Sequence, residues 1–233
     1  MRILRKTKLL RLVFTLLVFA ITSFYLLAHA KDLPKDFPFK EKNSLKEWEE
    51  KIFRGRVLYS VKENKGGGYL TAYSKQAASG IFYQIKFDPK KEPMIRWKWK
   101  VLRFPKKGTV APDGGGWIEQ DDYAARFYVI FPKLAFNLTK ALEYVWDRDL
   151  PVGTINSSPY SKNIKIMVIE SGRRNLKRWV EEERNVYEDF KKAFGQEPGI
   201  VGAIAIMTDT DNTRSTAEAH YDEIKVGYKN ETK

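Results

Sequence analysis

The chain has 233 residues and no cysteine, and its 42 basic and 29 acidic residues give a formal net charge of +13. Without cysteine it can form no disulfide and no thiolate metal site. His29 and His220 are its only histidines, which is too few for a multi-histidine zinc site or for several common catalytic arrangements. No P-loop, dinucleotide fingerprint or nucleophile elbow is present, so the sequence assigns no catalytic residue.

Residues 1–30 have the pattern of a secretory signal peptide. Five basic and no acidic residues precede an apolar run over residues 12–28, which ends in Ala28-His29-Ala30, a small-x-small sequence. We therefore expect the rest of the chain to be exported. The apolar run also lies at the lower limit for a membrane-spanning helix, so an uncleaved anchor is the alternative. Membrane contact is expected only through this segment, if it is retained.

Removing residues 1–30 takes away five basic and no acidic residues, which lowers the net charge from +13 to +8. A positive surface favours anionic partners such as phospholipid, lipopolysaccharide or acidic glycan. The Lys and Arg residues are scattered among acidic ones rather than clustered, so we expect no nucleic-acid partner.

Beyond a polar linker at 31–43, the spacing of Leu45, Trp48 and Ile52 predicts a short helix over 44–53. The clearest strand is 94–104, where apolar residues alternate with Arg96, Lys98 and Lys100. The other predicted strands are 56–63, 69–74, 80–88, 122–131, 164–170, 200–207 and 217–228, and a second helix is predicted over 184–194. Segment 133–144 is ambiguous, and segments 105–119 and 151–161 are predicted loops.

Eight or nine strands with few helices predict an all-β fold, an antiparallel β-sandwich over residues 44–233 as one domain. The helices do not alternate with the strands, which argues against a doubly wound α/β fold.

Segment 120–129, QDDYAARFYV, resembles the strand that marks an uncharacterised bacterial family, domain of unknown function 3047. Further segments match in the same order at 96–101, 142–146, 184–195 and 204–213, so that the resemblance covers roughly residues 45–228. It implies an exported bacterial sandwich of jelly-roll type, similar in outline to carbohydrate-binding modules, in the periplasm of a Gram-negative cell. Asp147, Arg214 and segment 220–222 depart from the family pattern. The family has no assigned activity and implies no catalytic residues.

One candidate binding site is the turn after the predicted strand 200–207. Asp209, Asp211 and Asn212 offer the oxygen ligands that Ca²⁺ prefers, although the glycine and distal glutamate of an EF-hand are absent. The same side chains could instead bind their own backbone in an Asx-rich turn. Calcium is therefore a weak alternative to a site with no cofactor.

A second candidate is the start of the predicted strand 122–131. Residues four apart on a strand share a face, so Asp122 and Arg126 are expected to point together while Asp121 points away. The pair could bind a sugar or form a structural ion pair. Trp117, in a glycine-rich loop, could stack on a sugar ring.

These residues favour a non-catalytic β-sandwich module that binds a glycan or another envelope component through Asp122, Arg126, Asp209, Asp211, Asn212 and Trp117. One alternative is a glycan hydrolase or lyase in which carboxylates such as Asp122 and Asp209 act as an acid/base pair. The other is a structural or assembly protein of the envelope.

Overall fold

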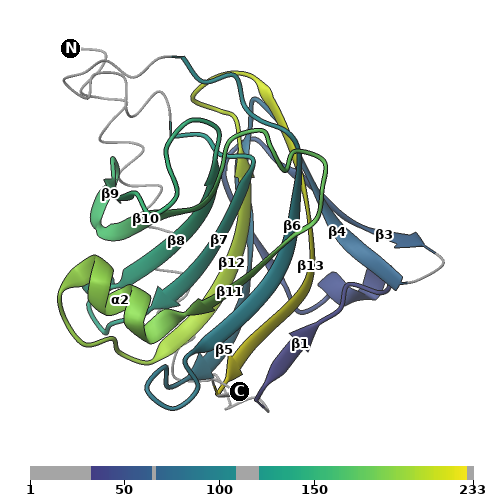
Figure 1. Cartoon of the computed structure of the whole chain (residues 1–233). Coiled ribbons are helices and arrows are strands. Elements are labelled where there is room, and N and C mark those ends of the chain that lie inside the picture. Colours follow the sequence, from purple (N-terminus) through teal and green to yellow (C-terminus); the bar gives the residue numbers. More distant parts are fainter. Residues whose placement is uncertain (1–32, 65–66, 109–120, 230–233) are drawn as a thin grey trace.

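The protein is represented by a computed structural model that describes residues 33–64, 67–108 and 121–229. In these ranges, thirteen strands form two sheets that pack face to face as a β-sandwich (Figure 1). The predicted all-β, jelly-roll-like sandwich is confirmed, with one departure from antiparallel pairing between β8 and β10. The predictions for residues 1–30 and for Trp117 lie outside the described residues.

The six-stranded sheet, here called sheet A, has the order β11-β6-β13-β4-β3, and β1 also pairs with β13. Its strands are β1 (Lys35–Phe37), β3 (Leu58–Asn64), β4 (Gly67–Lys75), β6 (Met94–Arg103), β11 (Val180–Asn185) and β13 (Thr216–Tyr228). The seven-stranded sheet B has the order β2-β5-β12-β7-β8-β10-β9. Its strands are β2 (Glu49–Arg54), β5 (Ala78–Phe87), β7 (Ala125–Phe131), β8 (Lys140–Asp147), β9 (Ile155–Ser158), β10 (Ser161–Ser171) and β12 (Val201–Asp209).

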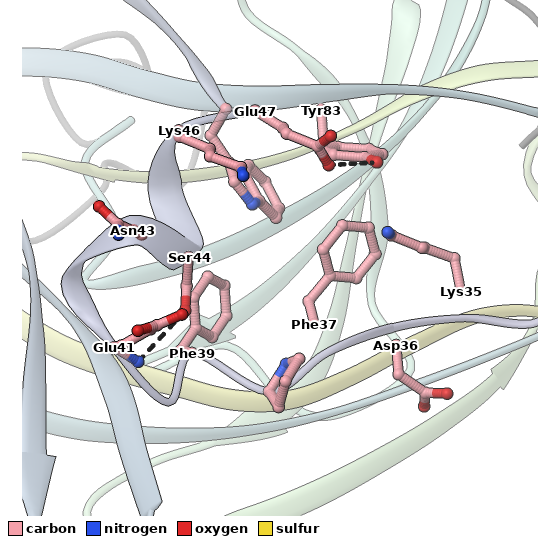
Figure 2. A pocket seen from close by; sticks show the side chains of 12 residues that line it. Lys35, Asp36, Phe37, Phe39, Glu41, Asn43, Ser44, Lys46, Glu47 and Tyr83 are labelled. Carbon is pink, nitrogen blue, oxygen red and sulfur yellow. Dashed lines mark hydrogen bonds between the residues drawn. The ribbon is translucent and has the colours of Figure 1, made fainter.

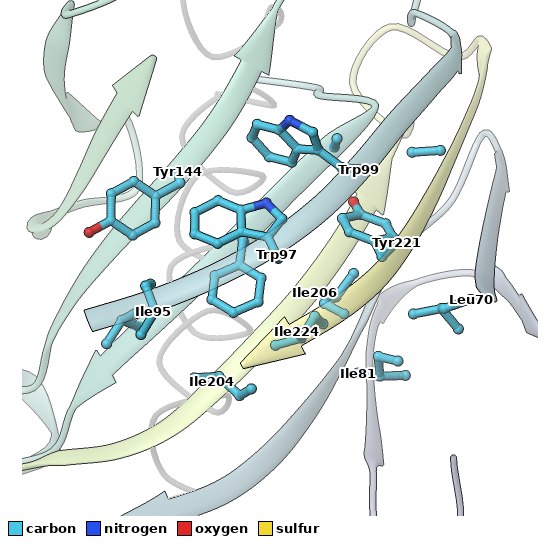
Figure 3. Packing of buried hydrophobic residues seen from close by; sticks show 14 of the residues in the cluster. Leu70, Ile81, Ile95, Trp97, Trp99, Tyr144, Ile204, Ile206, Tyr221 and Ile224 are labelled. Carbon is cyan, nitrogen blue, oxygen red and sulfur yellow. The ribbon is translucent and has the colours of Figure 1, made fainter. Parts of the chain in front are cut away.

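The core lies between the sheets and follows the period-two pattern of the strands. Trp97 and Trp99 of β6 are fully buried, while the alternating Lys98 and Lys100 are only partly buried (Figure 3). The Trp97 ring stacks on Phe127 of β7 with ring centroids 4.5 Å apart, which joins the two sheets. Trp146 of β8 is also buried, and its indole N–H donates to the carbonyl of Gly172.

The α-helix α2 (Val186–Phe194) follows β11 and confirms the helix predicted over 184–194. The side chain of Asn185 caps it by accepting a hydrogen bond from the N–H of Glu188. Gly195 ends it with φ +65°, a left-handed conformation that suits glycine. The ring of Phe190 contacts Phe131, so the helix closes one end of the core.

The helix predicted over 44–53 is wrong. The chain makes a short 3₁₀ turn, η1 (Lys42–Leu45), and then β2, which pairs with the edge of β5. An isolated ten-residue helix is marginal, whereas the edge of β5 offers backbone hydrogen-bond partners over the length of β2, with one irregularity between Ile52 and Arg54. Segment 31–43, expected as a linker, contributes β1, which pairs with β13.

The ambiguous segment 133–144 contains the 3₁₀ turn η3 (Phe136–Leu138) and the start of β8, and the predicted loop 151–161 contains β9. Among the described residues, no helix is long and apolar enough to cross a membrane.

Candidate functional site

The candidate site lies where the end of β12 meets the chain that leads into β7. Because β7 and β12 are antiparallel, with Met207 opposite Arg126, segment 121–126 comes beside the turn at 209–213. Five of the six candidate residues therefore lie together, namely Asp122, Arg126, Asp209, Asp211 and Asn212.

Arg126 is at the centre of this cluster and is 2% exposed. Its guanidinium donates through Nη2 to Asp209 at 2.7 Å and through Nη1 to Glu143 of β8 at 2.7 Å. Nη1 also lies 3.2 Å from the hydroxyl of Tyr128. The guanidinium thus bridges three strands of sheet B.

The expected pairing of Arg126 with Asp122 is wrong. β7 begins at Ala125, so strand alternation does not apply to residues 121 and 122. Nη2 of Arg126 instead donates to the backbone carbonyl of Asp121, whose side chain was expected to point away. The carboxylate of Asp122 accepts the backbone N–H groups of Asn212 at 3.3 Å and Thr213 at 2.6 Å. Asp122 therefore fixes the turn rather than the arginine.

Burial controls the protonation of these carboxyl groups. It raises the pKa of Asp209 well above its usual value, and Arg126 offsets this only in part. Burial also raises the pKa of Glu143. The pKa of Asp121 rises to about 8, so Asp121 is mostly protonated at neutral pH. The cluster is therefore stable because it combines one fixed cation with carboxyl groups that need not all ionise.

Among the described residues, Asp122, Asp209 and Asp211 form a group of acidic residues that could hold a cation, since their ligand oxygens lie within 4.8 Å of one another. Two of them are already engaged. Asp122 accepts two backbone N–H groups, and Asp209 accepts the backbone N–H of Tyr123 and the guanidinium of Arg126. A metal ion here would be repelled by that guanidinium, so the donor set fits calcium poorly.

The same contacts bear on the hydrolase alternative. Glycoside hydrolysis needs an acid and a base that face the scissile bond. Asp122 is 0% and Asp209 3% exposed, and both carboxylates are held by protein donors. In the described arrangement, both carboxylates stabilise the turn at 209–213: Asp209 is part of it, and Asp122 accepts hydrogen bonds from its backbone.

The outer part of the site is a rim formed by the exposed Arg54, the half-buried Tyr160 and Asn212, and the buried Asp211. The side-chain amide of Asn212 donates to the hydroxyl of Tyr160 at 3.0 Å, and Arg54 lies 3.8 Å from the Asp211 carboxylate. The Arg54 side chain is 57% exposed. With Phe53, this rim surrounds a cavity of about 40 Å³ that reaches Arg126 and Asp209. That volume holds one or two water molecules rather than a sugar ring, so a ligand would lie across the rim.

The chain matches one known family over residues 46–225, under the description "protein of unknown function (DUF3047)". It belongs to the DUF3047 family. The match covers most of both sheets and includes every residue of the buried cluster. Comparison with curated proteins gives no match.

Solved structures similar to this DUF3047 chain include two carbohydrate-binding modules of Clostridium thermocellum. The family 11 module of the cellulase Lic26A-Cel5E is 11% identical, with 87% of this chain and 97% of the module covered and a TM-score of 0.46. The family 30 module of Cel9D-Cel44B is 8% identical, with 84% and 99% covered and a TM-score of 0.45.

A third similar structure is an enzyme, a cellulase derived from Cel12A of Rhodothermus marinus. It is 8% identical, with 83% of this chain and 95% of the cellulase covered and a TM-score of 0.44. Binding modules and an enzyme are thus similar to this DUF3047 chain at the same low level, and a shared fold does not carry an activity with it.

Sequence reasoning missed Glu143, which supplies the second carboxylate to Arg126 in this DUF3047 chain. A signal was present, because Glu143 is the one charged residue in the apolar run 141–146. A charge in a buried strand needs a partner, and Arg126 is the matching charge in the preceding predicted strand, 122–131. Tyr160 lies in the predicted loop 151–161, and its bond to Asn212 depends on the conformation of the turn between β9 and β10.

Proposed function

We propose that this DUF3047 chain is an exported, non-catalytic module that binds a glycan of the bacterial envelope across the rim of Arg54, Tyr160, Asp211 and Asn212. The observation that carries the proposal is the way the turn at 209–213 is held. Asp122 accepts two backbone N–H groups of this turn, and Arg126 donates to the carboxylate of Asp209 at its start. The rim side chains are therefore held in one arrangement.

The rim has the chemistry that a sugar needs. Arg54 offers an exposed guanidinium and Asn212 a half-buried amide, and the mostly buried Asp211 carboxylate lines the cavity beside them, so donors and an acceptor face hydroxyl groups at the rim. Phe53 and Tyr160 add apolar ring surface beside them, and aromatic rings pack against the C–H face of a pyranose. This combination favours a neutral or weakly acidic glycan.

The proposal is tested by binding of the purified chain to an array of envelope polysaccharides, with affinities measured by calorimetry. Asn212→Ala and Asp211→Asn each remove one polar contact, so we expect about a tenfold weaker affinity from each. Trp179→Ala is the control, since this 39% exposed ring lies in the turn before β11, on sheet A.

Equal affinity in the wild type and both rim variants would refute the proposed site. A loss confined to Trp179→Ala would move the ligand to sheet A and equally refute it. Turnover of a polysaccharide by the purified chain would overturn the non-catalytic assignment.

Export is the second part of the proposal and rests on the N-terminal charge and hydropathy pattern. Mass spectrometry of the protein from the periplasmic fraction is expected to show an N-terminus at Lys31. An intact N-terminus in the membrane fraction would indicate the anchored alternative, and recovery from the cytoplasm would contradict export.

A further inference from the structure

A separate pocket of about 220 Å³ is lined by β1, η1, the residues between η1 and β2, and Tyr83 of β5 (Figure 2), and it is called the edge pocket here. It shares no residue with the rim or the buried charge cluster. Its volume is below the roughly 300 Å³ at which pockets for drug-sized ligands begin, so it suits one ring-sized group.

Three aromatic side chains form the floor of this edge pocket. Phe37 is brought there because β1 pairs with β13, and Tyr83 points inward from β5. The Phe37 centroid lies 4.7 Å from that of Tyr83 and 5.3 Å from that of Trp48. All three rings are at least nine-tenths buried, so the floor is rigid.

The floor contains a polar group whose hydrogen bond is unmet. The indole N–H of Trp48 is buried and has no hydrogen-bond partner among the described residues, although Trp48 lines the pocket. Buried donors are almost always paired, because leaving one unpaired is costly. An acceptor atom brought by a ligand would meet this requirement.

The rest of the lining offers both donors and acceptors. The hydroxyl of Tyr83 donates to the carboxylate of Glu47 at 3.0 Å, which positions that carboxylate at the pocket (Figure 2). The ammonium of Lys35 lies 5.7 Å from the Phe37 centroid and 5.8 Å from that of Tyr83. The charged lining residues are Lys35, Lys46, Asp36, Glu41 and Glu47.

This lining selects among ligand classes. Acidic groups outnumber basic ones by one, so a strongly anionic ligand is disfavoured. A quaternary ammonium would suit the aromatic floor but has no acceptor for the Trp48 N–H. A pyranose ring has an apolar face, hydroxyl oxygens that accept and hydroxyl protons that donate.

We propose that the edge pocket binds a single pyranose ring, with the Trp48 N–H donating to a hydroxyl oxygen and Glu47 accepting a hydroxyl proton. The proposal rests on the proposed glycan binding for the class of ligand, but it assigns a second and separate site. A glycan chain held at both sites would gain avidity without further contacts.

Saturation-transfer NMR with the purified chain and free D-glucose, D-galactose and N-acetylglucosamine tests the pocket directly. Trp48→Phe keeps an aromatic ring in the floor but removes the N–H together with part of the ring surface, and we expect about tenfold weaker binding of the sugar that gives the signal. Trp179→Phe makes the same chemical change on sheet A and is expected to leave the signal unchanged.

The outcomes separate the two sites. A monosaccharide signal that survives Asn212→Ala but is lost in Trp48→Phe supports the edge pocket, whether or not the rim binds polysaccharide. No signal from any of the three sugars, or an equal signal in Trp48→Phe, overturns it. Loss of the signal in Asn212→Ala alone would place the sugar at the rim and overturn the proposal. Binding of tetramethylammonium, with no sugar bound, would show a cation site and would also overturn it.

Discussion

Replacing Arg126 by methionine tests the account of the buried cluster most directly. The substitution keeps much of the side-chain volume but removes the charge that contacts Asp209 and Glu143, each at 2.7 Å. Breaking a buried ion pair by removing one partner costs about 3–5 kcal/mol, because the other charge stays buried without compensation. Two carboxylates lose their cation here, so we expect the free energy of unfolding to fall by about 4 kcal/mol at neutral pH.

The loss should depend on pH with a definite sign. Burial already raises the pKa of both carboxyl groups, and removing Arg126 raises each pKa further. A raised folded-state pKa contributes stability at low pH that is lost as the pH rises through that value. The cost of Arg126→Met is therefore smallest near pH 5 and largest near pH 8, changing by up to about 1.4 kcal/mol for each pH unit over which one carboxyl group titrates.

Urea unfolding followed by tryptophan fluorescence at both pH values measures this cost. Lys98→Met is the control, since Lys98 lies 2.7 Å from Glu223 on the outer surface of sheet A and such surface pairs contribute at most about 1 kcal/mol. Adding Asp209→Asn to the Arg126→Met variant should recover part of the loss. A cost below about 1 kcal/mol, or one that is equal at both pH values, would refute the reasoning.

Three further predictions concern other parts of the fold. Burial, and then the charge of Glu170, raise the pKa of Glu182 to about 7. The stability that Glu182 contributes is therefore lost as the pH rises from about 4.5 through 7, and Glu182→Gln should stabilise the chain by about 1–2 kcal/mol at pH 8 but not at pH 4. Equal effects at both pH values in urea unfolding would contradict this. Asn185→Ala removes the cap of α2 and should cost about 1 kcal/mol, measured the same way, whereas no cost would mean that the cap is dispensable. Calcium should leave the midpoint of thermal unfolding unchanged because Arg126 already compensates Asp209, whereas a bound ion at a hundredfold excess over its Kd would add about 2.7 kcal/mol.

Local patterns in the sequence determined most of the strands. The alternation over residues 94–104 places Trp97 and Trp99 inward whatever the partner strand is, because successive side chains of a strand point to opposite faces. The helix α2 was also predictable, since its apolar spacing, cap and terminal glycine are all local signals.

Edge elements could not be predicted in the same way. Segment 44–53 has helical spacing, yet from Glu49 onward it pairs with β5, a strand far along the chain. β1 likewise exists because β13 is beside it. A local pattern does not record which strand edge is free, so only the tertiary structure decides these elements.

The candidate site was likewise predictable only in part from the sequence. The sequence by itself indicated that Asp122, Arg126 and the 209–212 turn belong to polar clusters, because charges next to apolar strands need partners. Only the tertiary structure decided the partners. The antiparallel pairing of β7 with β12 and β8 brings Arg126 within hydrogen-bonding distance of Asp209 and Glu143. Asp122 instead binds the backbone of the turn, because the pairings set which groups lie within reach.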